Sequence, residues 1–205
     1  MFKGYIYFTA SLVGLVFSEA WLVNSYVKES SFPWDSLIAF LLAIGAVYTS
    51  LEQFKKDIRD SKKSEKDAEL FKELIEVLPP ERTISFFKHT DFHGSVLRSE
   101  LDGLRQFRAY WDSVDKEFFD KKIDAGRKKM YSAVDTFMAK YSTYTSPVGD
   151  GDFASVYTDT IYDGIFPDET VNNLKKKADE LNSIADSLAK QYEEFVREGK
   201  RKFII

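Results

Sequence analysis

Residues 4–27 read GYIYFTASLVGLVFSEAWLVNSYV and residues 36–51 read SLIAFLLAIGAVYTSL, two apolar stretches that precede a polar, lysine-rich remainder. As a helix, the first stretch extends roughly 36 Å, enough to cross a hydrocarbon core of about 30 Å. Counted from Trp34 to Phe54, the second reaches roughly 20 residues and also has the length of a membrane span. Tyrosine and tryptophan residues cluster toward the ends of both stretches, as is typical of membrane–water interfaces. The sequence therefore predicts a transmembrane helical hairpin over residues 1–54.

The connection between the two stretches, residues 28–35, is so short that the helices must run antiparallel. It contains one lysine, whereas a cluster of cations follows the second stretch: Lys55, Lys56, Arg59, Lys62, Lys63 and Lys66. By the positive-inside rule, both termini and the remainder of the chain face the cytoplasm. We therefore predict a multi-pass protein of the cell inner membrane.

The first stretch also fits a second interpretation, a secretory signal peptide. Lys3, the apolar run and the small residues Ser18 and Ala20 imitate a signal that is cleaved after Ala20. Apolar character continues through Trp21, Leu22 and Val23, which favours an uncleaved helix.

A charged stalk helix is predicted over residues 55–78, because apolar residues keep a helical spacing until Pro79 and Pro80 end it. Lys55, Arg59, Lys62 and Lys66 share one face of this helix. We expect that face to contact anionic lipid, although interspersed carboxylates weaken its field.

Residues 79–205 are predicted to form a cytosolic helical domain, so the fold class is all-α. Apolar residues recur at three- and four-residue steps in most of it, with Ser95 as an N-cap and an irregular connection over residues 142–169. The helices are expected at residues 81–89, 96–118, 121–141 and 171–198.

Composition and motifs exclude several classes of function. The chain has no cysteine, so disulfides, thiol nucleophiles and thiolate metal sites are ruled out. The formal net charge of −4 argues against binding to long nucleic acid. Phosphate-binding glycine loops, the Gly-x-Ser-x-Gly elbow and His-Glu-x-x-His are all absent from the sequence, so no enzyme and no cofactor are predicted.

One helix–turn–helix segment combines cations with aromatic residues, the combination that a nucleotide pocket needs. The candidate ligand-binding residues are Arg82, Lys88, His89, His93, Arg98, Arg105 and Arg108. The competing interpretation makes Phe86, Phe87 and Trp111 core residues, and Arg98, Asp102 and Arg105 an ion-pair ladder on the surface. The runs Arg127-Lys128-Lys129 and Lys175-Lys176-Lys177 are expected to be solvated helix faces.

No metal site is predicted. His89 and His93 are four residues apart, but Gly94 indicates that the helix has ended and no third ligand is evident. The aspartates at 150, 152, 159, 163 and 168 lack the spacing of an EF-hand, so a solvated loop is expected there.

Glu19 lies well inside the first apolar stretch, where a carboxylate is costly unless it is neutral, paired or in a wet interior. It either lines such an interior or extends toward the outer headgroups. Small residues offer faces for close helix contact. They are Ser11, Gly14 and Ser18 in the first helix and Ala39, Ala43 and Ala46 in the second.

A short antiparallel membrane hairpin that leads into a cytosolic helical domain without an enzyme motif resembles the two-helix membrane effectors of prokaryotic antiviral systems. In that class, including CRISPR and cyclic-oligonucleotide pathways, a cytosolic domain senses a signal and the membrane part disturbs the bilayer. The resemblance is one of architecture across most of the chain and assigns no functional residue.

The leading hypothesis is therefore a non-enzymatic effector whose helical domain binds a small anionic signal, such as a cyclic nucleotide. Because two helices cannot enclose a pore, the hairpins must form a homo-oligomer. The alternative is a passive membrane anchor whose helical domain recruits a protein partner. A third hypothesis is an enzyme that uses aspartate or histidine residues of the loop 142–169.

Overall fold

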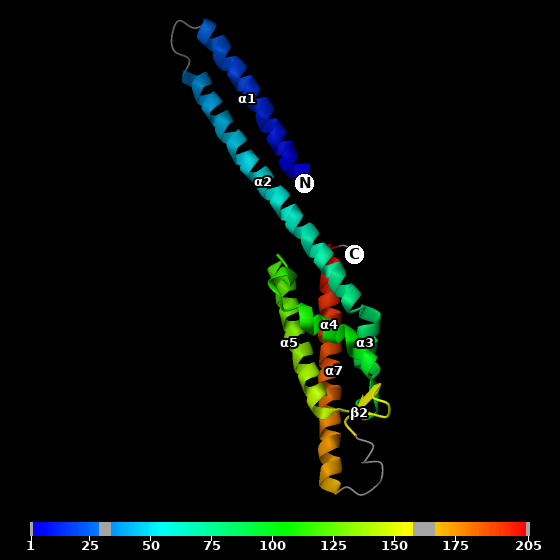
Figure 1. Cartoon of the computed structure of the whole chain (residues 1–205). Helices are drawn as coiled ribbons and strands as arrows, with labels where there is room; N and C mark the ends of the chain where they lie inside the picture. The colour runs from blue at the N-terminus through cyan, green and yellow to red at the C-terminus, as the bar shows by residue number, and fades with distance from the viewer. Residues whose placement is uncertain (1, 29–33, 158–166, 204–205) are drawn as a thin grey trace. The chain divides into compact units, whose positions relative to one another are not determined.

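The computed structural model describes residues 2–28, 34–157 and 167–203 of the chain. It divides into two compact units, Met1–Glu65 and Lys66–Ile205. The first unit is the helical hairpin and the second is a helical domain, so the all-α fold class is confirmed (Figure 1).

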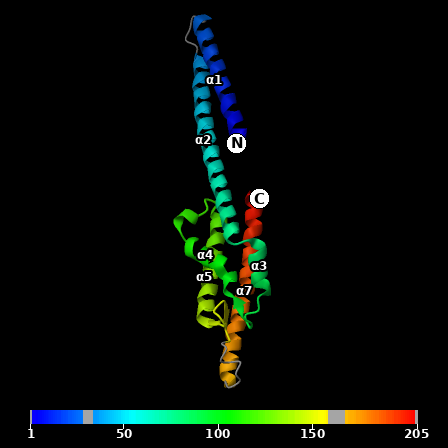
Figure 2. The ribbon, with the colours of Figure 1, turned by 45° about the vertical axis from the view of Figure 1, so that its right-hand side comes forward.

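The hairpin consists of α1, Phe2–Lys28, and the first part of α2, Trp34–Val77, which run antiparallel and side by side (Figures 1 and 2). Both helices are long and apolar enough to cross a membrane, with a mean hydropathy of 1.6 in the apolar window of each. No residue of either window is buried inside the protein. The apolar side chains of the hairpin therefore face outward, as a lipid environment requires.

A seam of small residues joins the two helices of the hairpin. The Oγ atoms of Ser11 and Ser50 are 2.6 Å apart, and the rings of Phe8 and Phe54 stack with their centroids 5.8 Å apart. The less exposed positions recur in steps of three and four, so that the seam has a seven-residue repeat. Small positions are Gly4, Ser11, Ser18 and Ser25 on α1, and Ser36, Ala43, Ser50 and Asp57 on α2.

Larger residues fill the layers between the small positions of the seam. They are Phe8, Leu15 and Leu22 on α1, and Phe40, Val47 and Phe54 on α2. Gly4 allows the closest approach, because a Cβ atom there would lie 2.4 Å from Oδ2 of Asp57. The alternation of small and large layers sets the register of the antiparallel pair.

The second unit begins within α2, at Lys66, whereas the predicted cytosolic domain begins at residue 79. Phe71, Leu74 and Leu78 are almost fully buried in its core. The second half of the predicted stalk is therefore a core helix of the domain. Its end is as expected, since α2 stops at Val77 and Pro80 occupies the first turn of α3, Pro80–His89.

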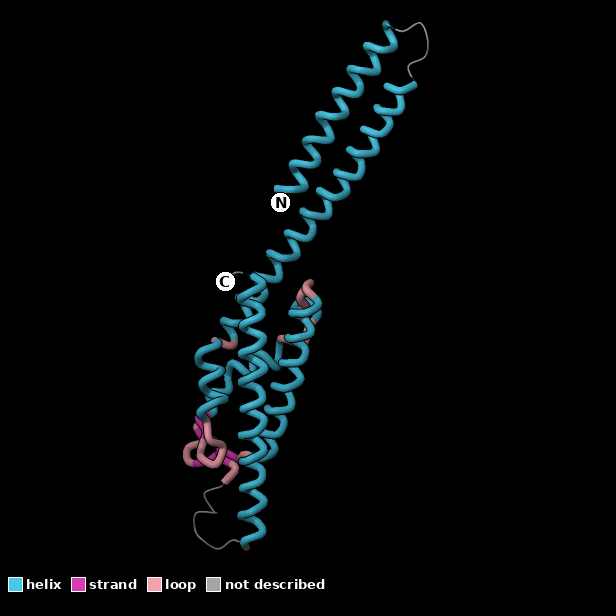
Figure 3. The backbone as a smooth tube through the Cα atoms, turned by 180° about the vertical axis from the view of Figure 1, so that it is seen from behind, coloured by secondary structure: helices cyan, strands magenta, loops and turns pink. Residues whose placement is uncertain are grey.

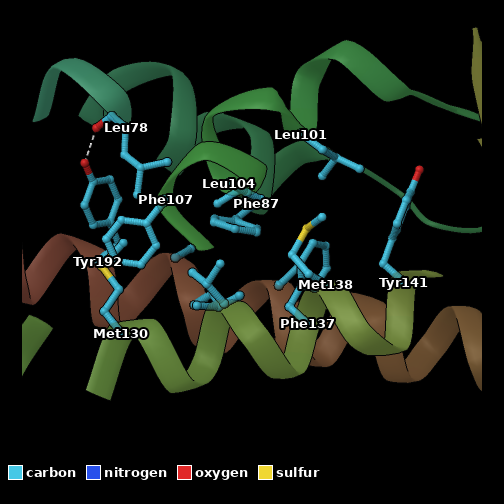
Figure 4. Close-up of a cluster of buried hydrophobic side chains, with 14 of the residues drawn as sticks. Leu78, Phe87, Leu101, Leu104, Phe107, Met130, Phe137, Met138, Tyr141 and Tyr192 are labelled. Carbon is cyan, nitrogen blue, oxygen red and sulfur yellow. Dashed lines mark hydrogen bonds between the residues drawn. The ribbon is translucent and has the colours of Figure 1, made fainter. Parts of the chain in front are cut away.

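The remaining helices of the unit are α4, Asp102–Tyr110, α5, Lys121–Tyr144, and α7, Asp168–Phe203. Two short 3-10 helices, η1, Arg98–Leu101, and η2, Val114–Lys116, flank α4. The long α7 packs against both α3 and α5 (Figure 3). A buried apolar cluster fills the space between these helices (Figure 4).

A small antiparallel sheet lies beside the helices, in the order β1–β3–β2. Its strands are β1, Val96–Leu97, β2, Ser146–Val148, and β3, Phe153–Ser155. The β2–β3 turn contains Gly149 and Gly151 at φ of 60° and 89°, a backbone region that favours glycine. The sheet occupies part of the segment that was expected to be irregular.

The predicted helix over residues 96–118 is wrong in its extent. Only Asp102–Tyr110 is α-helical, because Val96 and Leu97 pair with Ala154 and Phe153 in the sheet. The helix ends where the buried guanidinium of Arg127 donates a hydrogen bond to the carbonyl of Trp111. Both causes lie far away in the sequence, so local periodicity does not reveal them.

Candidate functional site

Glu19 lies next to the seam of the hairpin. Its neighbour Ser18 is a seam position, whereas the side chain of Glu19 is exposed on the outside of α1. Among the residues that the structure describes, none forms a hydrogen bond or an ion pair with Glu19. The carboxylate therefore does not point into an interior of its own hairpin.

The seam is closed by its own hydrogen bonds. Ser11 donates to the carbonyl of Phe8 at 2.8 Å and contacts Ser50, and Ser18 donates to the carbonyl of Leu15 at 2.8 Å. Gly14, expected to contact the other helix, would meet no atom within 4 Å if it carried a Cβ. Ser11, Ser18 and Ala43 are at the seam, while Gly14 and Ala46 are exposed.

The basic face of α2 is exposed along its whole length: Lys55, Arg59, Lys62 and Lys66 are all solvent-accessible. Lys55 is 3.7 Å from Glu52, and such an exposed pair adds little stability. Lys66 belongs to the second unit, where it lines a hollow of the helical domain.

The seven candidate cations of the helical unit do not converge on one site. Five of them pair with a carboxylate from a different position: Arg82 with Glu100, Lys88 with Glu193, His93 with Asp179, Arg105 with Asp102 and Arg108 with Asp135. Arg98 donates to the carbonyl of Gly151 at 3.1 Å, while His89 has no polar partner among the described residues. The expected ladder on α4 is present in part, with Arg105 2.6 Å from Asp102.

Two of the seven, Arg82 and His89, line one shallow hollow of about 370 Å³ beside Phe86. Glu100 lines it as well, and its carboxylate forms an ion pair with Arg82 at 3.2 Å. The aromatic residues expected to stack on a base are part of the core instead. Phe87 and Trp111 are each 1% exposed, as the competing interpretation predicted.

His93 holds the loop after α3 against α7. Its Nε2 is 2.9 Å from Oδ1 of Asp179 and its Nδ1 is 3.2 Å from the hydroxyl of Tyr157. Beside it, Asp91 accepts from the backbone N–H of His93 and from Asn182, and these bonds lower the pKa of its carboxyl. His93 therefore has a structural contact, and His89 lies apart from it on the surface.

Arg127 corrects the expectation that the run 127–129 is a solvated face. Its side chain is 1% exposed, and its Nε donates to Asp124 at 2.9 Å. Burial alone raises the pKa of Asp124, but hydrogen bonds from Lys128 and Arg127 outweigh it and hold this pKa below the usual value. Lys128 and Lys129 are exposed, as are Lys175 and Lys176 of the second run.

No group of three or more histidine, aspartate or glutamate residues suited to a metal ion occurs within residues 2–28, 34–157 and 167–203. Asp159 and Asp163 of the candidate loop lie outside the described residues. The remaining part of that loop contains β2 and β3.

A surface that the sequence did not suggest lies beside the end of α2. Tyr110, Val114 and Phe119 expose 64%, 83% and 53% of their areas there. A hollow of about 580 Å³ runs between residues 66–73 and 114–119, and one of about 510 Å³ adjoins it at Glu73 and Asp115. No signal in the sequence indicated this surface, because the apolar residues of the segment 110–119 continue the helical period that predicted a helix over residues 96–118.

No protein-family model matches the chain, and neither the curated proteins nor the solved structures contain a significant match to it. Function therefore rests on the chain's own residues.

Proposed function

We propose that this protein is a membrane-embedded, non-enzymatic effector of antiviral defence that acts as a homo-oligomer of its hairpins. In this proposal the helical unit is cytosolic, receives a signal and alters the packing of the hairpins, which then perturb the bilayer. Two apolar helices without buried windows support membrane insertion. The resemblance in architecture supports the biological role.

The observation that carries the proposal is the unpartnered carboxylate of Glu19. An acidic side chain at the centre of a membrane helix costs about 2.5–3.5 kcal/mol by insertion scales. The seam supplies no partner, because its hydroxyls bond to carbonyls and to each other. A second hairpin that packs against this side of α1 removes the carboxylate from lipid, and several such copies enclose a polar path.

The interface is tested by oxidative crosslinking of single cysteines, which a cysteine-free chain makes unambiguous. Leu12 lies two helical turns before Glu19 on the same side of α1, so Leu12→Cys should give disulfide-linked dimers in membranes. Phe17→Cys, on the far side and 72% exposed, is the matched control and should remain monomeric. Equal crosslinking of both variants would contradict an interface at Glu19.

Membrane activity is tested by release of a trapped dye from liposomes that contain the purified full chain. Glu19→Gln should abolish most of the release, whereas Glu52→Gln, at the end of the apolar part, should leave it unchanged. If the Glu19→Gln protein released dye like the parent, the effector proposal would be refuted and the passive membrane anchor would remain as the explanation.

For the signal, a small anion such as a cyclic nucleotide is the proposed class, with the hollow lined by Arg82 and His89 as its binding site. A phosphate that binds there competes with Glu100 for Arg82. Calorimetry of the full chain in detergent with a panel of cyclic nucleotides tests this. The absence of binding at micromolar concentrations would refute only the proposal that the signal is a cyclic nucleotide.

The alternative, an anchor that recruits a protein partner, is favoured by a different observation. Tyr110, Val114 and Phe119 are large apolar side chains exposed on the helical unit, outside any membrane segment. Exposed apolar groups that gather in one place mark interaction sites.

A further inference from the structure

We infer that the surface formed by the end of α2 and the segment 110–119 is a docking site for a basic, amphipathic segment of a partner protein. This inference deepens the recruitment alternative and does not depend on whether the hairpins perturb the membrane. It commits to a partner that presents apolar side chains together with lysine or arginine.

Apolar contact comes from residues that the fold leaves out of its core. Val114 lies in the 3-10 turn η2 and is 83% exposed, while the next residue of the run to be buried is Phe118, at 5%. Tyr110, the last residue of α4, is 64% exposed. The adjoining hollows of about 580 and 510 Å³ are large enough to accept apolar side chains of a bound segment.

The rim of this surface is acidic. Glu69 and Glu73 of α2 and Asp115 and Glu117 of the segment 110–119 line the larger hollow. Hydrogen bonding from Ser113 and from backbone lowers the pKa of Asp115, so its charge persists in mildly acidic solution. The carboxylates repel phosphate, nucleic acid and anionic lipid, and they select a cationic partner.

Lys66 also lines the larger hollow and is exposed, whereas the other two cations near the rim, Lys116 and Lys128, are already engaged. Lys116 bonds to Glu73, with its ammonium 5.3 Å from the centre of the Trp111 ring, and its side chain is only 17% exposed. Lys128 pairs with Glu117 and Asp124. Glu69 is exposed and has no ion pair among the described residues, so it is available to an incoming lysine or arginine.

Charge also argues against the chain's own helices as occupants of the site within one molecule. The basic end of α7 is held by the domain, because Lys202 pairs with Asp120 at 2.8 Å. The cations of α3 and α4 pair with carboxylates elsewhere. A basic segment from another molecule is therefore the complement that this surface lacks.

The test uses the full chain in nanodiscs of zwitterionic lipid and two fluorescent probe peptides, measured by anisotropy against empty nanodiscs. Both peptides present leucine on one helical face, and their other face presents lysine in one and glutamate in the second. The lysine peptide should bind and the glutamate peptide should not. Equal binding of the two, or no binding of the lysine peptide, would overturn the inference.

Variants locate the binding on this surface. Val114→Asp and Glu69→Lys should each lower the affinity for the lysine peptide several-fold. The first substitution adds a charge among the apolar contacts, and the second reverses a charge of the rim. Glu194→Lys, an exposed charge reversal on α7, is the matched control and should bind like the parent. If the control loses as much binding as Glu69→Lys, the attraction is general to the protein and the site is refuted.

A second copy of the chain is the competing occupant. If Val114→Asp dissociates an oligomer in light scattering while the lysine peptide fails to bind the parent, the surface joins copies and the inference of a basic partner is wrong. Leakage of dye by the Val114→Asp protein remains a separate readout, so that failure here is distinguishable from failure of the effector proposal.

Discussion

Arg127 shows how one buried cation organises the helical unit. It lies on α5, bonds to Asp124 one turn earlier and donates to the carbonyl at the end of α4. A guanidinium is suited to this position because its several N–H groups satisfy acceptors in different directions. The end of α4 therefore needs no glycine cap.

Arg127→Met should lower the free energy of unfolding by about 3 kcal/mol, because it leaves the carbonyl of Trp111 without the guanidinium donor and removes the buried positive charge beside Asp124. Lys129→Met, exposed two residues later, should change it by less than about 0.5 kcal/mol. The measurement is urea unfolding of the full chain in mild detergent, followed by Trp111 fluorescence with Trp21 and Trp34 replaced by phenylalanine. Equal effects of the two substitutions would refute the structural role of Arg127.

Acid should destabilise the same region. The pKa values of Asp124, Asp120 and Asp91 are all lowered in the fold, so their stabilising contribution is complete above the usual value of 3.8 and is lost as the pH falls below it. Thermal melting between pH 7 and pH 3 should therefore show its steepest loss below about pH 4. Asp124→Asn should flatten that loss, whereas Asp186→Asn, exposed on α7, should not.

Single positions were predictable to the extent that they follow a helical period. Arg127 falls on the stripe of Ile123, Met130 and Val134, so its burial could have been inferred from that spacing. The partners of the candidate cations could not be inferred from the sequence. Glu193 and Asp135 are remote in sequence from Lys88 and Arg108, and only the packing of α7 and α5 brings them near.

The hairpin is an element whose register is determined by alternating small and large layers. The repeat was partly visible in the sequence as small residues of both apolar stretches. Two predicted members, Gly14 and Ala46, were wrong because small size alone does not define a face, whereas a seven-residue spacing does. The boundaries of α2 and α3 were predictable because proline acts locally.

A paired substitution tests the register. Ser11→Cys together with Ser50→Cys should form an intramolecular disulfide, since the two hydroxyl oxygens are 2.6 Å apart. Intact mass and loss of maleimide reactivity report the bond. Gly14→Cys with Ser50→Cys is the control, and a bond that forms as readily there would show that the helices pair on another face.

Helix α4 marks the limit of periodicity as a predictor. The apolar pattern of α4 continues on both sides, yet Val96 belongs to a strand and Phe118 lies in the irregular segment between η2 and α5. Pairing with β3 forms hydrogen bonds to residues more than fifty positions away, and no local pattern contains that information.

Considered as a whole, the molecule consists of two units with different surfaces. The hairpin exposes apolar side chains along its length, while the helical unit buries its own behind a charged surface. This division was evident in composition. The boundary at Lys66 was not evident in composition, because the core residues of the C-terminal part of α2 follow a charged stretch without interruption.

The charges at the two ends of the hairpin predict its orientation in a membrane. Lys28→Cys should react with a membrane-impermeant maleimide on intact spheroplasts, and Lys200→Cys should react only after permeabilisation. Both positions lie in helices that the structure describes as solvent-exposed. Labelling of Lys200→Cys on intact spheroplasts would reverse the predicted orientation.

The contacts of Phe71 imply an order of events during synthesis. Its ring meets Phe195 and Phe203 of α7 at centroid distances of 5.7 and 5.6 Å, and a Cβ on Gly199 would lie 2.1 Å from it. The ribosome releases these partners more than 120 residues after Phe71. The hairpin thus emerges from the ribosome long before the helical unit is able to close its core. For the proposed membrane protein, we therefore expect anchoring to precede folding and the nascent domain to mature while it is tethered at the membrane surface.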